Sequence, residues 1–96
     1  MNGPSTICPM WGIVYRDTTT HFNNILMYSP PGETDYIKWR PVVSIPFMVH
    51  AYNTPGAPML FSSKDEAMAY IVEEGMDKFQ NAPYVVTIHV KKETAQ

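Results

Sequence analysis

The residues best suited to acid–base, nucleophilic or metal chemistry are three histidines and one cysteine, scattered along the chain. His21, His50 and His89 have no histidine or cysteine two, three or four positions further on, and neither does Cys8. Metal sites built from one element need such spacing. The chain has no G-x-G-x-x-G motif, and Pro55-Gly56 is typical of a turn. We therefore expect no enzymatic activity, no metal site and no cofactor.

The basic residues indicate a second kind of chemistry, the binding of anions. Four of them fall on the outward side of predicted strands, and two histidines share that parity. This candidate anion-binding set is Arg16, Lys38, Arg40, His50, His89 and Lys91. With nearby tyrosines, such a face could hold a nucleotide, another anionic ligand or single-stranded nucleic acid. The alternative is that a solvated sheet face must be polar in any case, and that lysines on strands discourage edge pairing.

Aromatic and methionine side chains favour a third function, protein recognition. The chain has six Tyr, two Trp and seven Met, and interfaces are enriched in aromatic residues and Met. The candidate partner-binding residues are four that surround a Pro/Gly turn, Met48, Tyr52, Met59 and Leu60, together with Tyr36. The alternative is that Met fills the core of a small protein.

Protein binding is the function that we prefer from the sequence. Small domains without enzymatic motifs are common among the accessory proteins of phages and mobile elements, many of which occlude a host protein. We expect an inhibitor or adaptor of this type, with an unidentified protein partner and a homodimer as one arrangement. Nucleotide or nucleic-acid binding on a cationic open sheet face is the alternative.

Length and composition limit the number of domains, the partners and the compartment that we expect. Ninety-six residues, 45% of them hydrophobic, are enough for one core and one domain. The net charge of −2 gives no overall reason to bind nucleic acid or an anionic membrane. A single cysteine, and the lack of a signal peptide or an apolar run of membrane-spanning length, indicate a cytoplasmic protein. We expect a flexible leader at 1–9, a domain at 10–92 and a tail at 93–96.

Alternation of side-chain polarity predicts strands in three stretches of the chain. Residues 37–51 have apolar side chains at every odd position, which predicts two strand segments or one bent edge strand, since Pro41 and Pro46 cannot donate hydrogen bonds. Residues 10–16 and 84–92 predict a first and a last strand. Residues 21–29 fit either a strand hairpinned to the first, which we favour, or a short helix.

One amphipathic helix is predicted after residue 62. Ser63 and Glu66 fit the S-x-x-E capping box, and Asn81-Ala-Pro83 ends the helical pattern. Gly75 indicates either close packing on the sheet or a second short turn. The apolar positions at helical spacing are Met68, Ile71, Val72, Met76 and Phe79.

The assembled prediction is an α+β fold with the order β-β-β-β-α-β. A small antiparallel or mixed sheet of four to five strands would carry the helix on one face. The helix would link the central strands to the last strand, which could then be parallel neighbours. The predicted core is Trp39, Val43, Ile45, Phe47, Val49, Ile71, Val72, Val86 and Ile88.

Overall fold

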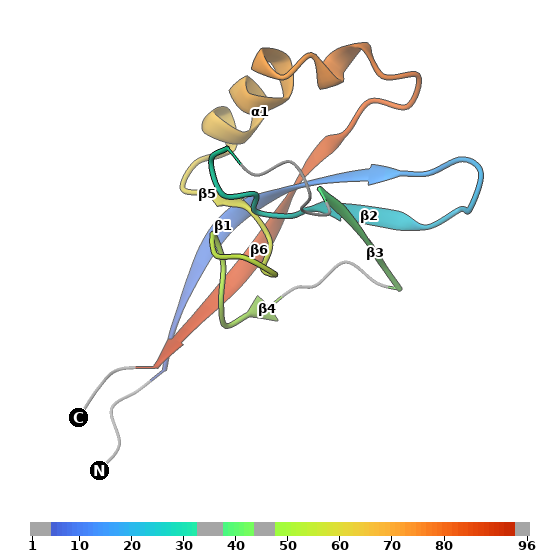
Figure 1. Ribbon diagram of the computed structural model, residues 1–96. Coiled ribbons are helices and arrows are strands. Elements are labelled where there is room, and N and C mark those ends of the chain that lie inside the picture. The colour runs from blue at the N-terminus through green and yellow to red at the C-terminus, as the bar shows by residue number, and fades with distance from the viewer. Residues whose placement is uncertain (1–4, 33–37, 44–47, 94–96) are drawn as a thin grey trace.

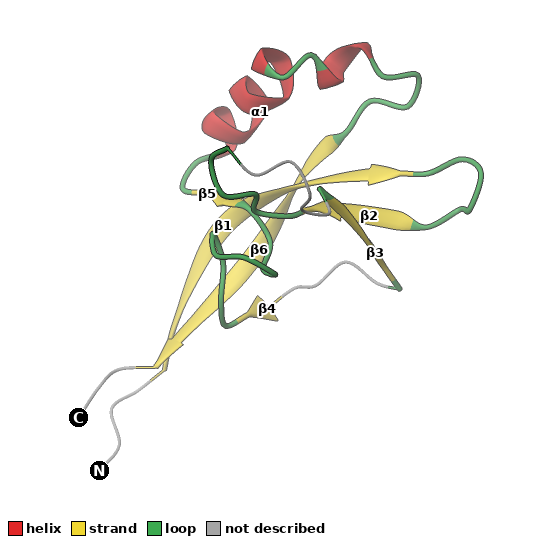
Figure 2. Ribbon diagram, viewed as in Figure 1, coloured by secondary structure: helices red, strands yellow, loops and turns green. Residues whose placement is uncertain are grey.

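A long first strand, β1 (Ser5–Arg16), pairs with the last strand, β6 (Tyr84–Glu93), and this antiparallel ribbon runs through the whole domain (Figure 1). The computed structural model describes residues 5–32, 38–43 and 48–93. In Figure 2 the helical segment lies at one end of the ribbon, above the point where the two strands cross.

The other strands extend this ribbon into a six-stranded, curled half-barrel sheet. β2 (Asn23–Leu26) pairs with β1, and β3 (Trp39–Val42) pairs with β2. On the other side, the short β4 (Met48–Val49) pairs with β6 in parallel. β5 (Leu60–Phe61) pairs with β1 outside the order β3-β2-β1-β6-β4. The predicted α+β fold is confirmed, as are the hairpin of residues 21–29 and the parallel neighbours.

Two details of the strand prediction differ from the structure. Residues 5–9, expected in the leader, are part of β1, where Pro9 lies opposite His89. The extra strand β5 has only two residues, and it forms between the turn that ends at Pro58 and the helix cap Ser63. Residues 1–4 and 94–96 lie outside the described residues.

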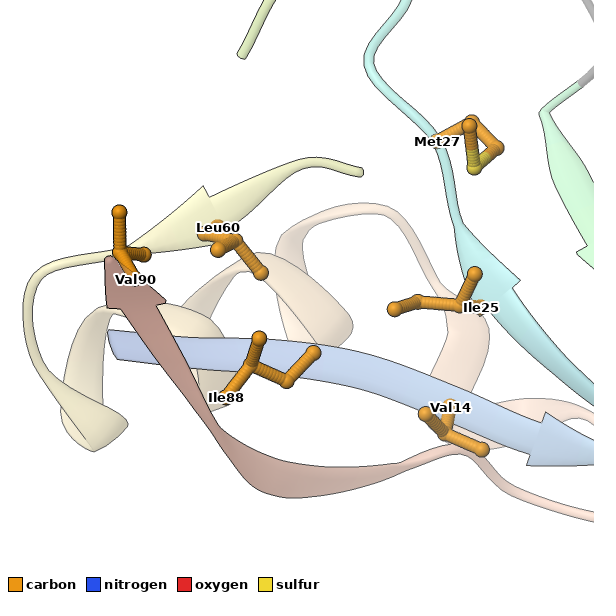
Figure 3. Close-up of a cluster of buried hydrophobic side chains, with 6 residues drawn as sticks. All are labelled: Val14, Ile25, Met27, Leu60, Ile88 and Val90. Carbon is orange, nitrogen blue, oxygen red and sulfur yellow. The ribbon is translucent and has the colours of Figure 1, made fainter. Parts of the chain in front are cut away.

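Two clusters of buried side chains cover the two faces of the central strands. The first, inside the curl of the sheet, contains Val14, Ile25, Met27, Leu60, Ile88 and Val90 (Figure 3). The second lies under the helix and contains Ile13, Leu26, Ala67, Ile71 and Met76. Successive residues of a strand point to opposite faces, so Ile13 and Val14 enter different clusters. The centre of the sheet is therefore packed on both sides.

The predicted core was wrong for the stretch 37–51. Val43 is fully exposed because β3 is an edge strand that ends at Val42, one residue earlier. Trp39 and Val49 are half-buried and pack against the edges of the second and first clusters. Ile45 and Phe47 lie outside the described residues. The prediction was right for Ile71 and Ile88, which are buried, while Val86 is half-buried against the first cluster.

The helix α1 (Lys64–Glu73) begins and ends at residues whose chemistry explains its limits. The Ser63 hydroxyl accepts a hydrogen bond from the Glu66 backbone N–H at 3.1 Å, as the capping box predicts. Gly75 has φ +71°, a left-handed conformation that stops the helix, and no atom lies within 4 Å of the position of an added Cβ. Close packing is thus excluded, and a short 3-10 helix, η1 (Met76–Lys78), follows.

The helix buries a narrower face than its apolar pattern predicts. Ala67 and Ile71, four residues apart, are the buried positions of α1, and Met76 of η1 joins them. Met68 and Val72 come one position later, about 100° further around the helix axis, and remain 50% and 62% exposed. Phe79 is also exposed. Placing Val72 in the core was therefore wrong.

Removing the helix cap should destabilise the domain measurably. Ser63→Ala leaves the Glu66 N–H without its side-chain partner, and we expect a loss of about 1 kcal/mol in the free energy of unfolding, measured by urea denaturation. Ser62→Ala is the matched control, because the Ser62 hydroxyl donates only to the exposed Glu66 carboxylate, at 3.1 Å. Equal losses for the two variants would contradict the capping role of Ser63.

Candidate functional site

The predicted partner-binding residues do not form one exposed surface. Leu60 is buried in the first cluster, and the Asn53 side chain exchanges two hydrogen bonds with the Leu60 backbone, at 2.9 and 3.1 Å, which tie the turn to β5. Tyr52 and Met59 are half-buried against the two clusters. Met48, on the edge strand β4, is exposed, and Tyr36 lies outside the described residues.

The strand register divides the predicted anion-binding residues between the two faces of the sheet. Arg40 pairs with Ile25, and Arg16 shares the parity of Val14, so both belong to the face of the first cluster. His89 and Lys91 alternate with Ile88 and Val90 and therefore lie on the opposite face. His50 follows β4 and is exposed. The Lys38 ammonium lies 3.9 Å from the Glu74 carboxylate, so Glu74 partly neutralises it.

The groups suited to metal or acid–base chemistry are not brought together. Within the described part of the chain, no three His, Cys, Asp or Glu side chains lie close enough to hold a metal ion. Cys8 is a half-buried free thiol on β1. Burial, and secondarily the Glu74 carboxylate, raise the pKa of the Tyr70 phenol, which packs on Phe61 with ring centroids 5.3 Å apart.

An apolar groove, which we call the helix groove, runs between α1 and the start of β6. Its volume is about 430 Å³. The lining residues are Lys64, Met68, Ile71, Val72, Asp77, Pro83, Tyr84 and Val85. Buried Ile71 and Pro83 fix its base to the core, while Met68, Val72 and the 44% exposed Tyr84 offer apolar surface to a partner. Neither the helix nor the strand must move to present these side chains.

The segment 64–78, which forms one wall of the helix groove, is acidic, although the two charged residues that line the groove carry opposite charges. Between residues 64 and 78 there are five acidic and two basic side chains, a net charge of −3, and all seven are exposed. These residues are Lys64, Asp65, Glu66, Glu73, Glu74, Asp77 and Lys78. Lys64 and Asp77 line the groove itself. A basic ligand would be attracted to this region over roughly 8 Å at physiological salt.

A second hollow, which we call the hairpin pocket, lies where the β1–β2 hairpin meets the segment after η1. Its volume is about 410 Å³, and it is lined by Tyr15, Arg16, Asp17, Thr18, Trp39, Phe79, Gln80 and Asn81. The Asn81 side-chain amide donates a hydrogen bond to the Arg16 carbonyl and ties the two segments together. Of the predicted site residues that the structure describes, Arg16 alone lines this pocket.

Both hollows were missed by the sequence analysis, although part of the signal was present. Met68 and Val72, at i and i+4, form a second apolar stripe beside Ala67 and Ile71, so the apolar arc is wider than one packing face. No local pattern brings Trp39 and Phe79 to one pocket, because the two residues are 40 positions apart in the chain.

No protein-family model, no curated protein and no solved structure matches the chain. In the described residues, no helix is long and apolar enough to span a membrane. The described residues form a small α+β domain, with the helix groove and the hairpin pocket on its surface.

Proposed function

We propose that the protein is a non-enzymatic binding protein that holds a segment of a protein partner in the helix groove. The observation that carries the proposal is the exposure of Met68, Val72 and Tyr84 around one hollow on rigid elements. Single exposed apolar residues are normal on a protein surface, but several gathered at one groove are typical of interaction sites.

The helix groove offers enough apolar surface for useful affinity. Fully burying a Met or Val side chain contributes about 1.5–3 kcal/mol, and Met68 and Val72 are each at least half exposed in the free protein. Tyr84 adds a ring with a polar hydroxyl, a side chain that interfaces favour. Because α1 and β6 are already ordered, little conformational entropy would be lost on this side of the interface.

The acidic segment 64–78 beside the groove favours a basic partner segment. With a net charge of −3 between residues 64 and 78, the best complement is a segment with apolar anchor side chains flanked by Lys or Arg. An amphipathic helix is one common form of such a segment. By covering that segment, the protein would act as an inhibitor or adaptor of its partner. The homodimer stays a prediction, with β3 and β4 as the edge strands of the described sheet.

Affinity capture followed by reconstitution tests this proposal. The partner is first recovered on the wild-type protein from a lysate of the host and is then purified. We expect Met68→Ala with Val72→Ala to weaken binding of the purified partner at least about ten-fold by calorimetry, because both anchors are truncated. Higher salt should weaken binding further, since the partner segment is basic.

Phe22→Ala with Met48→Ala is the matched control, because both side chains are large, apolar and about half exposed, and neither lines the groove. This control should bind like the wild type. If it loses the partner while the groove variant retains it, the interface lies elsewhere. If no protein binds the wild-type chain stoichiometrically, protein capture is not its function.

A further inference from the structure

Three aromatic side chains from distant parts of the chain meet at the hairpin pocket. Tyr15 comes from β1, Trp39 from β3 and Phe79 from the segment after η1. The Tyr15 and Trp39 rings are in edge-to-face contact, with centroids 4.9 Å apart and an interplanar angle of 72°. Trp39 also packs against the second cluster, so this pair is held in place from behind. The faces of aromatic rings are electron-rich and attract cations.

The Asp17 carboxylate gives the same pocket a negative charge. The Asp17 backbone N–H donates to the Phe22 carbonyl at 2.9 Å, so the pairing of β1 with β2 continues to this residue. By strand alternation, the Asp17 side chain therefore belongs to the sheet face of Tyr15. Its Oδ1 atom accepts hydrogen bonds from the Thr19 and Thr20 backbone N–H groups, at 2.7 and 3.2 Å, which orient the carboxylate. Its Oδ2 atom has no hydrogen-bond partner among the described residues.

No basic side chain among the described lining residues offsets this charge. Arg16 is the one basic residue of that set, and the register places its side chain on the opposite face, the face of the first cluster. The Arg16 backbone carbonyl accepts the hydrogen bond from Asn81, which brings the main chain of this residue to the pocket. The Lys38 ammonium lies 3.9 Å from the Glu74 carboxylate, and Lys38 does not line the pocket.

Unused acceptor atoms indicate which kind of cation fits. Asn81 uses its amide nitrogen on the Arg16 carbonyl, so its side-chain oxygen stays available, as does that of the exposed Gln80. Together with Asp17 Oδ2, these oxygens could receive several N–H groups. A guanidinium has five N–H donors in one plane and stacks on aromatic rings. An ammonium group has three donors and no flat face, so it matches this pocket less well.

We propose that the hairpin pocket binds the guanidinium group of an arginine side chain carried by a partner polypeptide. The plane of the guanidinium would lie against the aromatic rings, with its N–H groups directed to the Asp17 carboxylate and the two amide oxygens. A volume of about 410 Å³ is sufficient for one such side chain. Free arginine fits less well, because its α-carboxylate would be repelled by Asp17 and would meet no basic side chain of the described lining residues.

This site does not rest on the proposed function, because the hairpin pocket and the helix groove share no lining residue. It can therefore be tested with small probes, without the partner segment that the helix groove would hold. A positive result would identify an arginine as one anchor of the partner. A negative result would leave the helix groove and its own experiment unaffected.

Calorimetric titration of the wild-type protein with capped amino acids tests the site. We expect Nα-acetyl-arginine N-methylamide (capped arginine) to bind with a Kd of about 1 mM or tighter. Capped citrulline has nearly the same shape but no charge, and it should bind at least about ten-fold more weakly. Capped lysine and free arginine should each bind at least about three-fold more weakly. Two-dimensional NMR should place the shifts caused by capped arginine at Trp39 and residues 79–81.

Two variants test the proposed contacts. Asp17→Asn should weaken binding of capped arginine about ten-fold and leave binding of capped citrulline unchanged, because only the charge is removed. An asparagine keeps an oxygen acceptor for the Thr19 and Thr20 N–H groups, so the hairpin turn should be retained. Phe79→Ala should weaken binding of capped arginine about five-fold through the loss of one ring.

Each variant has a control outside the pocket. Asp65→Asn removes an exposed carboxylate of α1, and Ile7→Ala truncates a 52% exposed apolar side chain of β1. Both controls should bind capped arginine like the wild type. Absence of saturable binding, equal binding of capped arginine and capped citrulline, or equal effects of test and control variants would overturn the site. Capped lysine that binds as tightly as capped arginine would overturn the assignment to a guanidinium, and tighter binding of free arginine would overturn the assignment to a polypeptide side chain.

Discussion

Ile88→Ala should be the most damaging single truncation among the residues considered, with a loss of about 2–5 kcal/mol in the free energy of unfolding. Ile88 has no exposed surface and packs with buried side chains from β1, β2 and β5 (Figure 3). Truncation removes three carbon atoms and leaves a cavity that the surrounding strands can fill only in part. Because a small domain has a total stability of about 5–15 kcal/mol, this loss is a large fraction of it.

Thermal denaturation followed by circular dichroism measures this effect. For a domain of this size, about 1 kcal/mol corresponds to a change of roughly 4–8 °C in Tm. Val72→Ala is the matched control, since the sequence placed both residues in the core, while the structure leaves Val72 62% exposed on α1. The control should change stability by less than about 0.5 kcal/mol. A large loss for Val72→Ala would contradict the observed orientation of the helix.

Gly12→Ala should cost about 1–3 kcal/mol, and Ile88→Val should recover part of that loss. A Cβ at position 12 would lie 2.7 Å from Ile88 Cδ1 and 3.1 Å from Leu60 Cδ2. The clash is with the end of a side chain, so the chain can still fold, but only with Ile88 shifted from its rotamer. Ile88→Val deletes the Cδ1 atom and alone should cost about 0.5–1.5 kcal/mol.

A double-mutant cycle by urea denaturation isolates this contact. If the clash at Cδ1 is the main origin of the loss, the double variant should be more stable than the sum of the single losses predicts, by at least about 0.5 kcal/mol. Strict additivity would show that Leu60, or the backbone of β1, limits the space at position 12 instead. Either result concerns stability alone, because neither Gly12 nor Ile88 lines the two hollows.

The elements that the sequence predicted best are those with a local signal. The capping box at Ser63 and the alternation of residues 84–92 correctly located the helix start and the last strand. The alternation of residues 37–51 wrongly predicted a single buried face, because the sheet curls and packs apolar side chains on both faces. In β3, Trp39 packs against the second cluster and Val42 against the first. Both faces of this strand therefore contact a core, and alternation along the sequence does not identify one buried face.

The candidate sites depend on long-range arrangement, which explains why sequence reasoning missed them. The exposure of Met68 and Val72 follows from the rotation of α1 on the sheet, and the short side chain of Ala67 gives no strong signal for that rotation. The hairpin pocket requires β1, β3 and the segment after η1 to meet. Arg16 was singled out as a cation, but the aromatic residues of this pocket, Tyr15, Trp39 and Phe79, could be identified only in the folded chain.

The pairing of β1 with β6 also determines when this chain can fold. Partners in that ladder are between 70 residues apart, for Val14 and Tyr84, and 88 residues apart, for Ser5 and Glu93. Contacts so distant in sequence close large loops, which slows folding into the range of milliseconds to seconds. During synthesis, β6 leaves the ribosome last of the described elements, and it carries Ile88 and Val90. The first cluster therefore stays incomplete until translation of the domain is almost finished.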